Sequence, residues 1–134
     1  MEAASRDAMA SEFIEDYDDN YEHQAAIHGA NFSGGQKQRL LIARALAAKP
    51  EVLILDDSSS ALDYRTDAQL RKNIRENYSE STLVVIAQRV SSIMGLDQII
   101  MMDEGRIIGM GTHEQLLAST PQYRDIFETQ MGEV

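Results

Sequence analysis

The chain contains no cysteine, only two prolines, and far fewer basic than acidic residues. The absence of cysteine excludes disulfide bonds and is compatible with a reducing compartment. Lysine and arginine number 12 against 22 aspartates and glutamates, which gives a formal net charge of -10. Such an acidic chain is a poor non-specific binder of nucleic acid or anionic lipid, so we expect no nucleic-acid partner.

Long apolar runs are also missing: no stretch approaches the roughly 20 residues that a helix needs to cross a bilayer. The start, Met1–Asp7, lacks the basic region and apolar core of a signal peptide. We therefore expect a soluble, cytoplasmic chain that reaches a membrane only through a partner. Its 134 residues are the length of one domain, enough to bury a substantial core.

The most informative stretch is Asn31–Arg39, in which Ser33 precedes two adjacent glycines at the start of a predicted helix. Each glycine costs roughly 1 kcal/mol relative to alanine inside a helix, and a sequence accepts this cost where something must approach the backbone. Open N–H groups at the positive end of a helix favour a phosphate. Ser33 and Gln36 also match a capping box, a purely structural helix start. On this segment alone both interpretations stay open.

Residues 52–57 form a continuous apolar run that ends in two aspartates. The pattern predicts a buried parallel strand with Asp56 and Asp57 at its carboxyl end, where open α/β sheets place their ligands. A carboxylate at this edge commonly holds Mg²⁺ through water. A second apolar run, 82–87, predicts another strand and leads into Gln88.

In this order and spacing, the motifs resemble the nucleotide-binding domain of ATP-binding cassette (ABC) transporters. Phe32–Gln36 is similar to the family's signature loop, Val52–Asp56 to Walker B and Ser60–Asp63 to the D-loop. Gln88 falls where the family usually carries its switch histidine. The resemblance covers nearly the whole chain, and Gly111–Leu117 looks like the exporter branch.

The resemblance implies an α/β fold: a partial P-loop NTPase (RecA-like) core with parallel strands, a C-terminal hairpin and part of the ABC helical subdomain. It also implies that residues 1–134 form the C-terminal part of one nucleotide-binding domain, with a helical-lobe segment at 1–49 and the stretch from Walker B onward at 50–134. The residue patterns predict helices at 5–17 and 34–48, a strand at 52–56, a helix at 64–78, a strand at 82–87, a short helix at 90–94, a hairpin of 98–102 and 106–110, and helices beginning after Thr112 and at Pro121.

The sequence contains no Gly-x-x-x-x-Gly-Lys-Ser/Thr, the P-loop (Walker A) that cradles the β- and γ-phosphates. In the family this loop lies upstream of the segment that the resemblance covers. We therefore expect negligible ATP hydrolysis by the chain alone. We also expect its sheet to have an unpaired edge or an uncovered face.

Three positions depart from the family's pattern. Asp57 stands where the family usually has the glutamate that positions or deprotonates the attacking water, and aspartate is one methylene shorter. Gln88 can hydrogen-bond a γ-phosphate but, unlike histidine, cannot become charged near pH 7. Ile27 replaces an acidic residue that exporters often have before the signature. The first two changes together predict an ATP site that binds nucleotide but hydrolyses it poorly.

These features lead to the hypothesis of a heterodimeric exporter. By the resemblance, the signature of one domain completes the ATP site of the other in a head-to-tail dimer, and this signature is intact. The implied ligands are ATP and Mg²⁺, and the implied partners are a second, unlike nucleotide-binding domain and the transmembrane domains. The implied site residues are Ser33, Gly34, Gly35 and Gln36 for the partner's ATP, Asp56 for Mg²⁺, Asp57 and Gln88 for catalysis at this subunit's own site, and Asp63 at the dimer interface, where it also matches a helix N-cap.

Two other interpretations stay open: a homodimeric exporter with slow turnover, and a catalytically inactive fragment that docks on an intact domain. A soluble ABC ATPase of DNA repair or translation is disfavoured by the acidic charge and the exporter-like end. His23 and His28 have no further ligands at metal-binding spacing, so we expect no metal site there. His113 lies inside a capping box and is expected to be solvated. Arg39 and Arg44 are expected to hold structure rather than to touch nucleotide.

Overall fold

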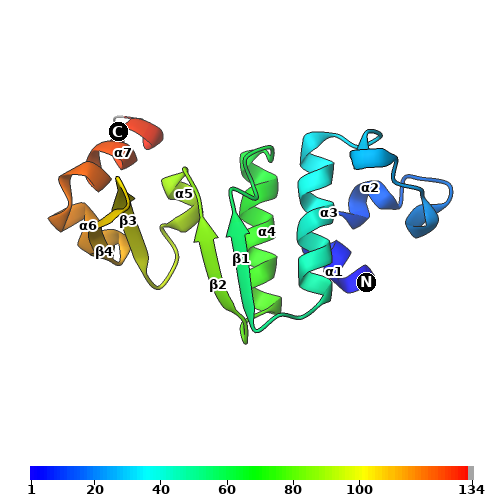
Figure 1. Cartoon of the computed structure of the whole chain (residues 1–134), viewed down its shortest axis with the longest axis horizontal. Coiled ribbons are helices and arrows are strands. Elements are labelled where there is room, and N and C mark those ends of the chain that lie inside the picture. Colours follow the sequence, from blue (N-terminus) through cyan, green and yellow to red (C-terminus); the bar gives the residue numbers. More distant parts are fainter. Residues whose placement is uncertain (133–134) are drawn as a thin grey trace. The chain divides into compact units, whose positions relative to one another are not determined.

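The computed structural model describes residues 1–132. The chain divides into two compact units, Met1–Ile86 and a second that begins at Ala87. The first unit combines a parallel strand pair with helices, and the second combines an antiparallel hairpin with helices (Figure 1). The α/β fold predicted from the sequence is confirmed.

The first unit is built around a β-α-β arrangement. β1 (Val52–Asp56) pairs in parallel with β2 (Thr82–Ile86), and α4 (Tyr64–Asn77) connects them. A second long helix, α3 (Gly34–Ala47), precedes β1, and Figure 1 shows α3 and α4 running alongside the strand pair. The predicted bounds of all four elements agree with these to within one residue.

The helix predicted at 5–17 is wrong. The chain instead forms two short helices, α1 (Glu2–Asp7) and α2 (Ser11–Ile14). Met9 between them adopts a left-handed φ of 59°, and a right-handed helix cannot continue through that conformation. The segment between α2 and α3 contains two single 3-10 turns, η1 (Asn20–Glu22) and η2 (Ile27–Gly29).

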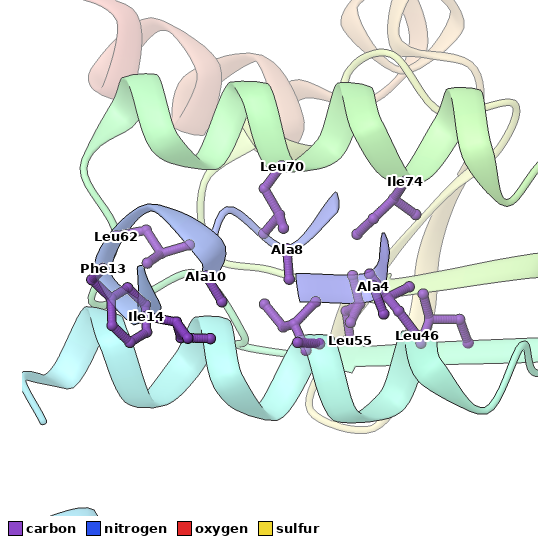
Figure 2. Close-up of a cluster of buried hydrophobic side chains, with 13 residues drawn as sticks. Ala4, Ala8, Ala10, Phe13, Ile14, Leu46, Leu55, Leu62, Leu70 and Ile74 are labelled. Atoms are coloured by element: carbon purple, nitrogen blue, oxygen red, sulfur yellow. The ribbon is translucent and has the colours of Figure 1, made fainter. Parts of the chain in front are cut away.

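The core of the first unit forms where the α1–α2 segment enters between α3 and α4 (Figure 2). Its alanines Ala8 and Ala10 are completely buried, and their small side chains let the segment approach both long helices. Leu46 on α3 and Leu70 on α4 close over them, each 1% exposed. The break at Met9 lies within this packing, with a fully buried alanine on each side of it.

A polar contact fastens the same segment to the end of α4. The Asp7 carboxylate accepts hydrogen bonds from Asn77 Nδ2 at 2.7 Å and from the Tyr78 hydroxyl at 3.0 Å. The Asp7 carbonyl oxygen accepts a third from Asn73 Nδ2 at 3.0 Å. Partial burial of the phenol and its hydrogen bond to Asp7 raise the pKa of Tyr78 to about 12.

This contact makes the free energy of unfolding depend on pH in the alkaline range. The pKa of Tyr78 is about 12 in the folded chain against an ordinary value of 10.0, so the folded state holds the phenol proton more tightly. Its contribution is complete below pH 10 and is lost as the pH rises through 12. We expect Tyr78→Phe to be about 1 kcal/mol less stable at pH 8, because the donor to Asp7 is gone, and to lose less stability than wild type between pH 10 and pH 12.

Urea unfolding followed by circular dichroism at a series of pH values measures both effects. Tyr64→Phe is the matched control, because Tyr64 begins the same helix and is 58% exposed. It should keep the alkaline slope of the wild type. An alkaline slope for Tyr78→Phe equal to that of the wild type would contradict the role given to this phenol.

The second unit confirms the predicted hairpin. β3 (Ile99–Asp103) and β4 (Arg106–Gly111) pair in antiparallel fashion. Glu104 and Gly105 connect them with φ values of 44° and 76°, the two left-handed residues of a type I′ turn. The helices of this unit are α5 (Val90–Ile93), α6 (His113–Ser119) and α7 (Pro121–Met131), and its core consists of Val90, Ile99, Leu116 and Tyr123.

One face of the parallel pair is exposed. Leu53 and Leu55 of β1 point into the core, whereas Val52 and Ile54, which alternate with them along the strand, are 54% and 62% exposed. The prediction that the whole β1 run is buried is therefore wrong for every second residue. The prediction of an uncovered face is confirmed for this strand pair. On β2 the exposed apolar residues are Val84 and Ile86.

Candidate functional site

Two segments of the first unit meet at the candidate site: the N-terminus of α3 and the loop of residues 57–63 that follows β1. Between them lies an open pocket of about 420 Å³. Ser33, Gly34 and Gly35 were predicted to contact a partner's ATP, and Asp63 was predicted to lie at a dimer interface. The structure brings these residues together at one pocket, although they are far apart in the sequence. The pocket is lined by Ser33, Gly34, Gly35, Arg39, Ala61, Leu62, Asp63 and Thr66.

The start of α3 has the predicted capping box. Ser33 Oγ accepts from the Gln36 amide at 3.2 Å, and Gln36 Oε1 accepts from the Ser33 amide at 2.8 Å. The amides of Gly34 and Gly35 lie in the first helical turn, where helix geometry supplies no intrahelical acceptor. The capping and anion-site interpretations are therefore compatible, because the cap satisfies Gln36 and leaves the glycine amides at the positive helix end.

The two glycines also press against the loop. A Cβ atom on Gly35 would lie 3.1 Å from the carbonyl oxygen of Ala61, closer than side chains normally approach a backbone oxygen. A Cβ atom on Gly34 would lie 3.5 Å from the Cβ of Ala61, an ordinary contact. Glycine at position 35 thus allows close packing of α3 on the loop, because an added Cβ would require the Ala61 carbonyl to move by a few tenths of an ångström.

The two aspartates lie at the carboxyl end of β1, with exposed side chains. Asp57 has a left-handed φ of 46°, which aspartate tolerates better than most residues. Its amide donates to the carbonyl oxygen of Ile86 at 2.9 Å, and its carbonyl oxygen accepts from the Ser60 hydroxyl at 3.1 Å. The exposed carboxylate of Asp56 fits a hydrated Mg²⁺, which needs only one or two carboxylates from the protein.

Asp63 caps α4. Its Oδ1 accepts from the amides of Arg65 and Thr66 at 3.0 Å each, and its Oδ2 accepts from the Thr66 hydroxyl at 2.7 Å. The bonds from Thr66, backbone first, hold the pKa of this carboxyl below its usual value, so Asp63 stays ionised. The N-cap predicted for it is confirmed, while its place at a dimer interface stays a prediction.

Arg39 extends from α3 toward the α1–α2 segment. Its Nη1 donates to the Met9 carbonyl oxygen at 2.7 Å, and its guanidinium carbon lies 4.8 Å from the centre of the Phe13 ring. The structural role expected for Arg39 is confirmed by these contacts. They hold α3 against the segment that breaks at Met9.

Gln88 belongs to the second unit, just before α5. Its side chain is exposed. Its carbonyl oxygen accepts from Gln130 Nε2 at 2.7 Å, and Gln130 Oε1 accepts from the Val90 amide at 2.8 Å. No pattern in the sequence indicated that Gln130 holds this turn in place.

The histidines make local contacts that the sequence did not indicate. His23 stacks on Tyr17 with ring centres 3.8 Å apart and bonds to Asp19 at 2.8 Å. His113 Nδ1 lies 2.9 Å from the Tyr123 hydroxyl. Within residues 1–132, no three His, Cys, Asp or Glu side chains are grouped so that they could hold a metal ion.

Gln38 is a site residue that sequence analysis missed. It connects α3 to Ser60 and Ala61 of the loop. The available signal was its spacing of four residues from Gly34, which puts both on the same face of the helix.

Comparison with known proteins gives consistent matches. Residues 2–60 match the family model described as ABC transporter. A putative ABC transporter ATP-binding protein of Mycoplasma genitalium is 41% identical over 130 residues, which are 97% of this chain and 21% of the relative. An ATP-dependent lipid A-core flippase of Aliivibrio fischeri is 39% identical over 133 residues, 99% of this chain and 23% of the relative.

A solved structure agrees with these relatives. The structure of a bacterial Atm1-family ABC exporter with ATP bound superposes with a TM-score of 0.92 at 35% sequence identity, over 98% of this chain and 23% of the exporter chain. The chain thus spans between a fifth and a quarter of the length of these three relatives. In the described part of the chain, no helix has the length and apolar character needed to cross a membrane.

Proposed function

Because the chain belongs to the ABC transporter family, as part of an ATP-binding domain homologous to those of exporters, we propose that it supplies the signature half of an ATP site shared with an unlike partner domain. The observation that carries this proposal is the open pocket at the N-terminus of α3. Gly34 and Gly35 line this pocket at the positive end of a 14-residue helix, where backbone amides favour an anion. ATP bound to a partner would place its terminal phosphate there, against Ser33, Gly34, Gly35 and Gln36.

The chain's own ATP site is the second element of the proposal. Asp56 would hold Mg²⁺ through water, while Asp57 and Gln88 would stand at the attacking water and the γ-phosphate. Mg²⁺ would supply charge neutralisation of the phosphates. With aspartate and glutamine in these positions, this site binds nucleotide but turns it over slowly.

The proposed place of the chain in an ABC exporter also implies its partners and its location. Residues 1–49 would form part of the helical lobe and residues 50–134 the Walker B part of the core, both within one nucleotide-binding domain. Asp63 would lie at the interface with the second domain. Transmembrane domains would hold the assembly at the cytoplasmic face of a membrane and couple ATP binding and hydrolysis to export.

Calorimetry of MgATP binding tests the proposal most directly. We expect no measurable binding to the chain alone, because the main cradle for the β- and γ-phosphates is missing from its sequence. Added to an intact ABC nucleotide-binding domain, the chain should tighten that domain's affinity for MgATP. Stoichiometric binding of MgATP to the chain alone would overturn the proposal.

One observation favours a second candidate, an interaction fragment without catalysis. The parallel strand pair exposes apolar residues on both strands, led by Ile54 at 62% and Ile86 at 52%. Such a face is suited to packing against another protein surface. In the same calorimetric experiment, this candidate predicts binding to the intact domain with no change in that domain's affinity for MgATP.

A further inference from the structure

Gln38 spans the space between α3 and the loop that follows β1. Its Oε1 accepts from the Ala61 amide at 3.0 Å. Its Nε2 donates to the Ser60 hydroxyl at 3.0 Å and reaches the Asp57 carbonyl oxygen at 3.5 Å. Both ends of one side-chain amide are therefore used, and a neutral amide is the side chain that offers a donor and an acceptor together.

The position of Gln38 on the helix explains why it reaches this loop. It lies four residues after Gly34, on the face where the glycines touch Ala61. The loop is thus held to α3 by close packing at the glycines and, one turn later, by hydrogen bonds to Gln38. The glycines and Gln38 therefore contact the same short stretch of the loop, residues 57–61.

The backbone of this stretch depends on these bonds. The Asp57 carbonyl oxygen is held by the Ser60 hydroxyl and Gln38, and the Asp57 amide by the carbonyl oxygen of Ile86. These bonds restrain the backbone on both sides of Asp57, whose φ of 46° is left-handed. Removing the Gln38 side chain would leave the Ala61 amide without its acceptor, and the Asp57 carbonyl oxygen would lose its contact with Nε2.

We propose that Gln38 is a positioning residue that joins the signature helix to the catalytic loop, so that Ser33–Gly35 and Asp57–Asp63 keep one fixed geometry. The inference deepens the proposed function, because it rests on the roles given there to Asp57 and to the glycines. It adds an internal link between this subunit's own site and the surface that it presents to a partner's ATP.

Two substitutions at Gln38 test its acceptor, Oε1, and its donor, Nε2, separately. Gln38→Leu is close in size and removes both the donor and the acceptor. Gln38→Glu keeps an acceptor for the Ala61 amide but places an anionic oxygen where Nε2 faced the Asp57 carbonyl oxygen. Gln69→Leu is the matched control, since Gln69 is exposed on α4 and its side chain bonds to Asn73, outside the site.

Amide hydrogen exchange and backbone chemical shifts of the nucleotide-free, full-length chain measure the link by NMR. In Gln38→Leu we expect exchange at the Ala61 amide to rise about tenfold and the Asp57 Cα and amide resonances to move away from their left-handed values. In Gln38→Glu, protection at Ala61 should return while Asp57 stays shifted. Gln69→Leu should leave both residues at wild-type values.

The proposal is overturned if Asp57 and Ala61 in both Gln38 variants exchange and resonate as in the wild type. It is also overturned if the variants accelerate exchange uniformly along the chain, because this would mean general destabilisation. Should Gln38→Leu fail to fold, Gln38→Glu alone decides through the opposite responses expected at the two residues. Since no nucleotide is present, this result is independent of the MgATP calorimetry, and either proposal can fail without the other.

Discussion

Asp57→Glu combined with Gln88→His should raise ATP hydrolysis at this subunit's own site by about 100-fold in the assembled exporter. Aspartate is one methylene shorter than glutamate, so its carboxylate falls short of a water that a glutamate would reach. The backbone cannot advance to compensate, because the Asp57 amide is bonded to Ile86 at 2.9 Å and its carbonyl oxygen to Ser60 at 3.1 Å. A displacement of about 1 Å commonly costs on the order of 100-fold in rate.

The measurement is the steady-state ATPase rate of the full-length pair with the partner's own site inactivated by mutation. Asp18→Glu with Gln24→His is the matched control, since it makes the same two chemical changes at exposed positions outside the site. The restored histidine should also introduce an acid limb near pH 6.5 into the rate profile, which glutamine cannot produce. A rate equal to that of the control would exclude the degenerate-site hypothesis.

Local patterns predicted the parts of the fold whose causes are local. Ser33 and Asp63 carry their capping partners within three residues, and the structure has both caps. The hairpin at Glu104 and Gly105 was predictable because Gly105 adopts the left-handed conformation that a two-residue turn needs without a steric cost. In each case the determining contacts lie within one turn of chain.

The wrong predictions concern segments whose structure is determined by packing against residues far away in the sequence. The residues around Met9 have good helix propensity, yet the helix breaks there because Ala8 and Ala10 are buried between α3 and α4. Likewise, the apolar run of β1 predicted burial on both faces, although Val52 and Ile54 are exposed. Propensity and hydrophobicity describe the residue itself, whereas burial depends on which segments cover it.

At the candidate site, too, the local features were predicted and the contacts between distant segments were not. Residue types and the order of the motifs identified Ser33–Gly35 and Asp57–Asp63 separately. They could not predict the contact between the two segments, which depends on how α3 packs on the loop. Gln38 was missed for this reason: its hydrogen-bond partners are 19 to 23 residues away in the chain.

Gly35→Asp should reduce hydrolysis at the partner's ATP site by about 100- to 1000-fold, the range for losing an aligned donor at developing charge. The new carboxylate would occupy the position of the terminal phosphate and repel it. Its Cβ would also lie 3.1 Å from the Ala61 carbonyl oxygen and push the loop away from α3. The fold should survive, because an acidic residue in the first turn is favourable for a helix.

Alanine substitutions at the two glycines separate charge repulsion from crowding. Gly35→Ala adds the crowded Cβ without charge, whereas Gly34→Ala adds a Cβ at an ordinary 3.5 Å from Ala61. Alanine favours helix at both positions, so neither variant should lose stability through α3 itself. We expect the partner-site rate to be highest in Gly34→Ala, lower in Gly35→Ala and lowest in Gly35→Asp.

Ala68→Asp, which adds a charge at an exposed position on α4, serves as the control. If Gly35→Asp hydrolyses ATP as fast as Ala68→Asp, the N-terminus of α3 does not contact the partner's nucleotide, and the shared-site proposal fails.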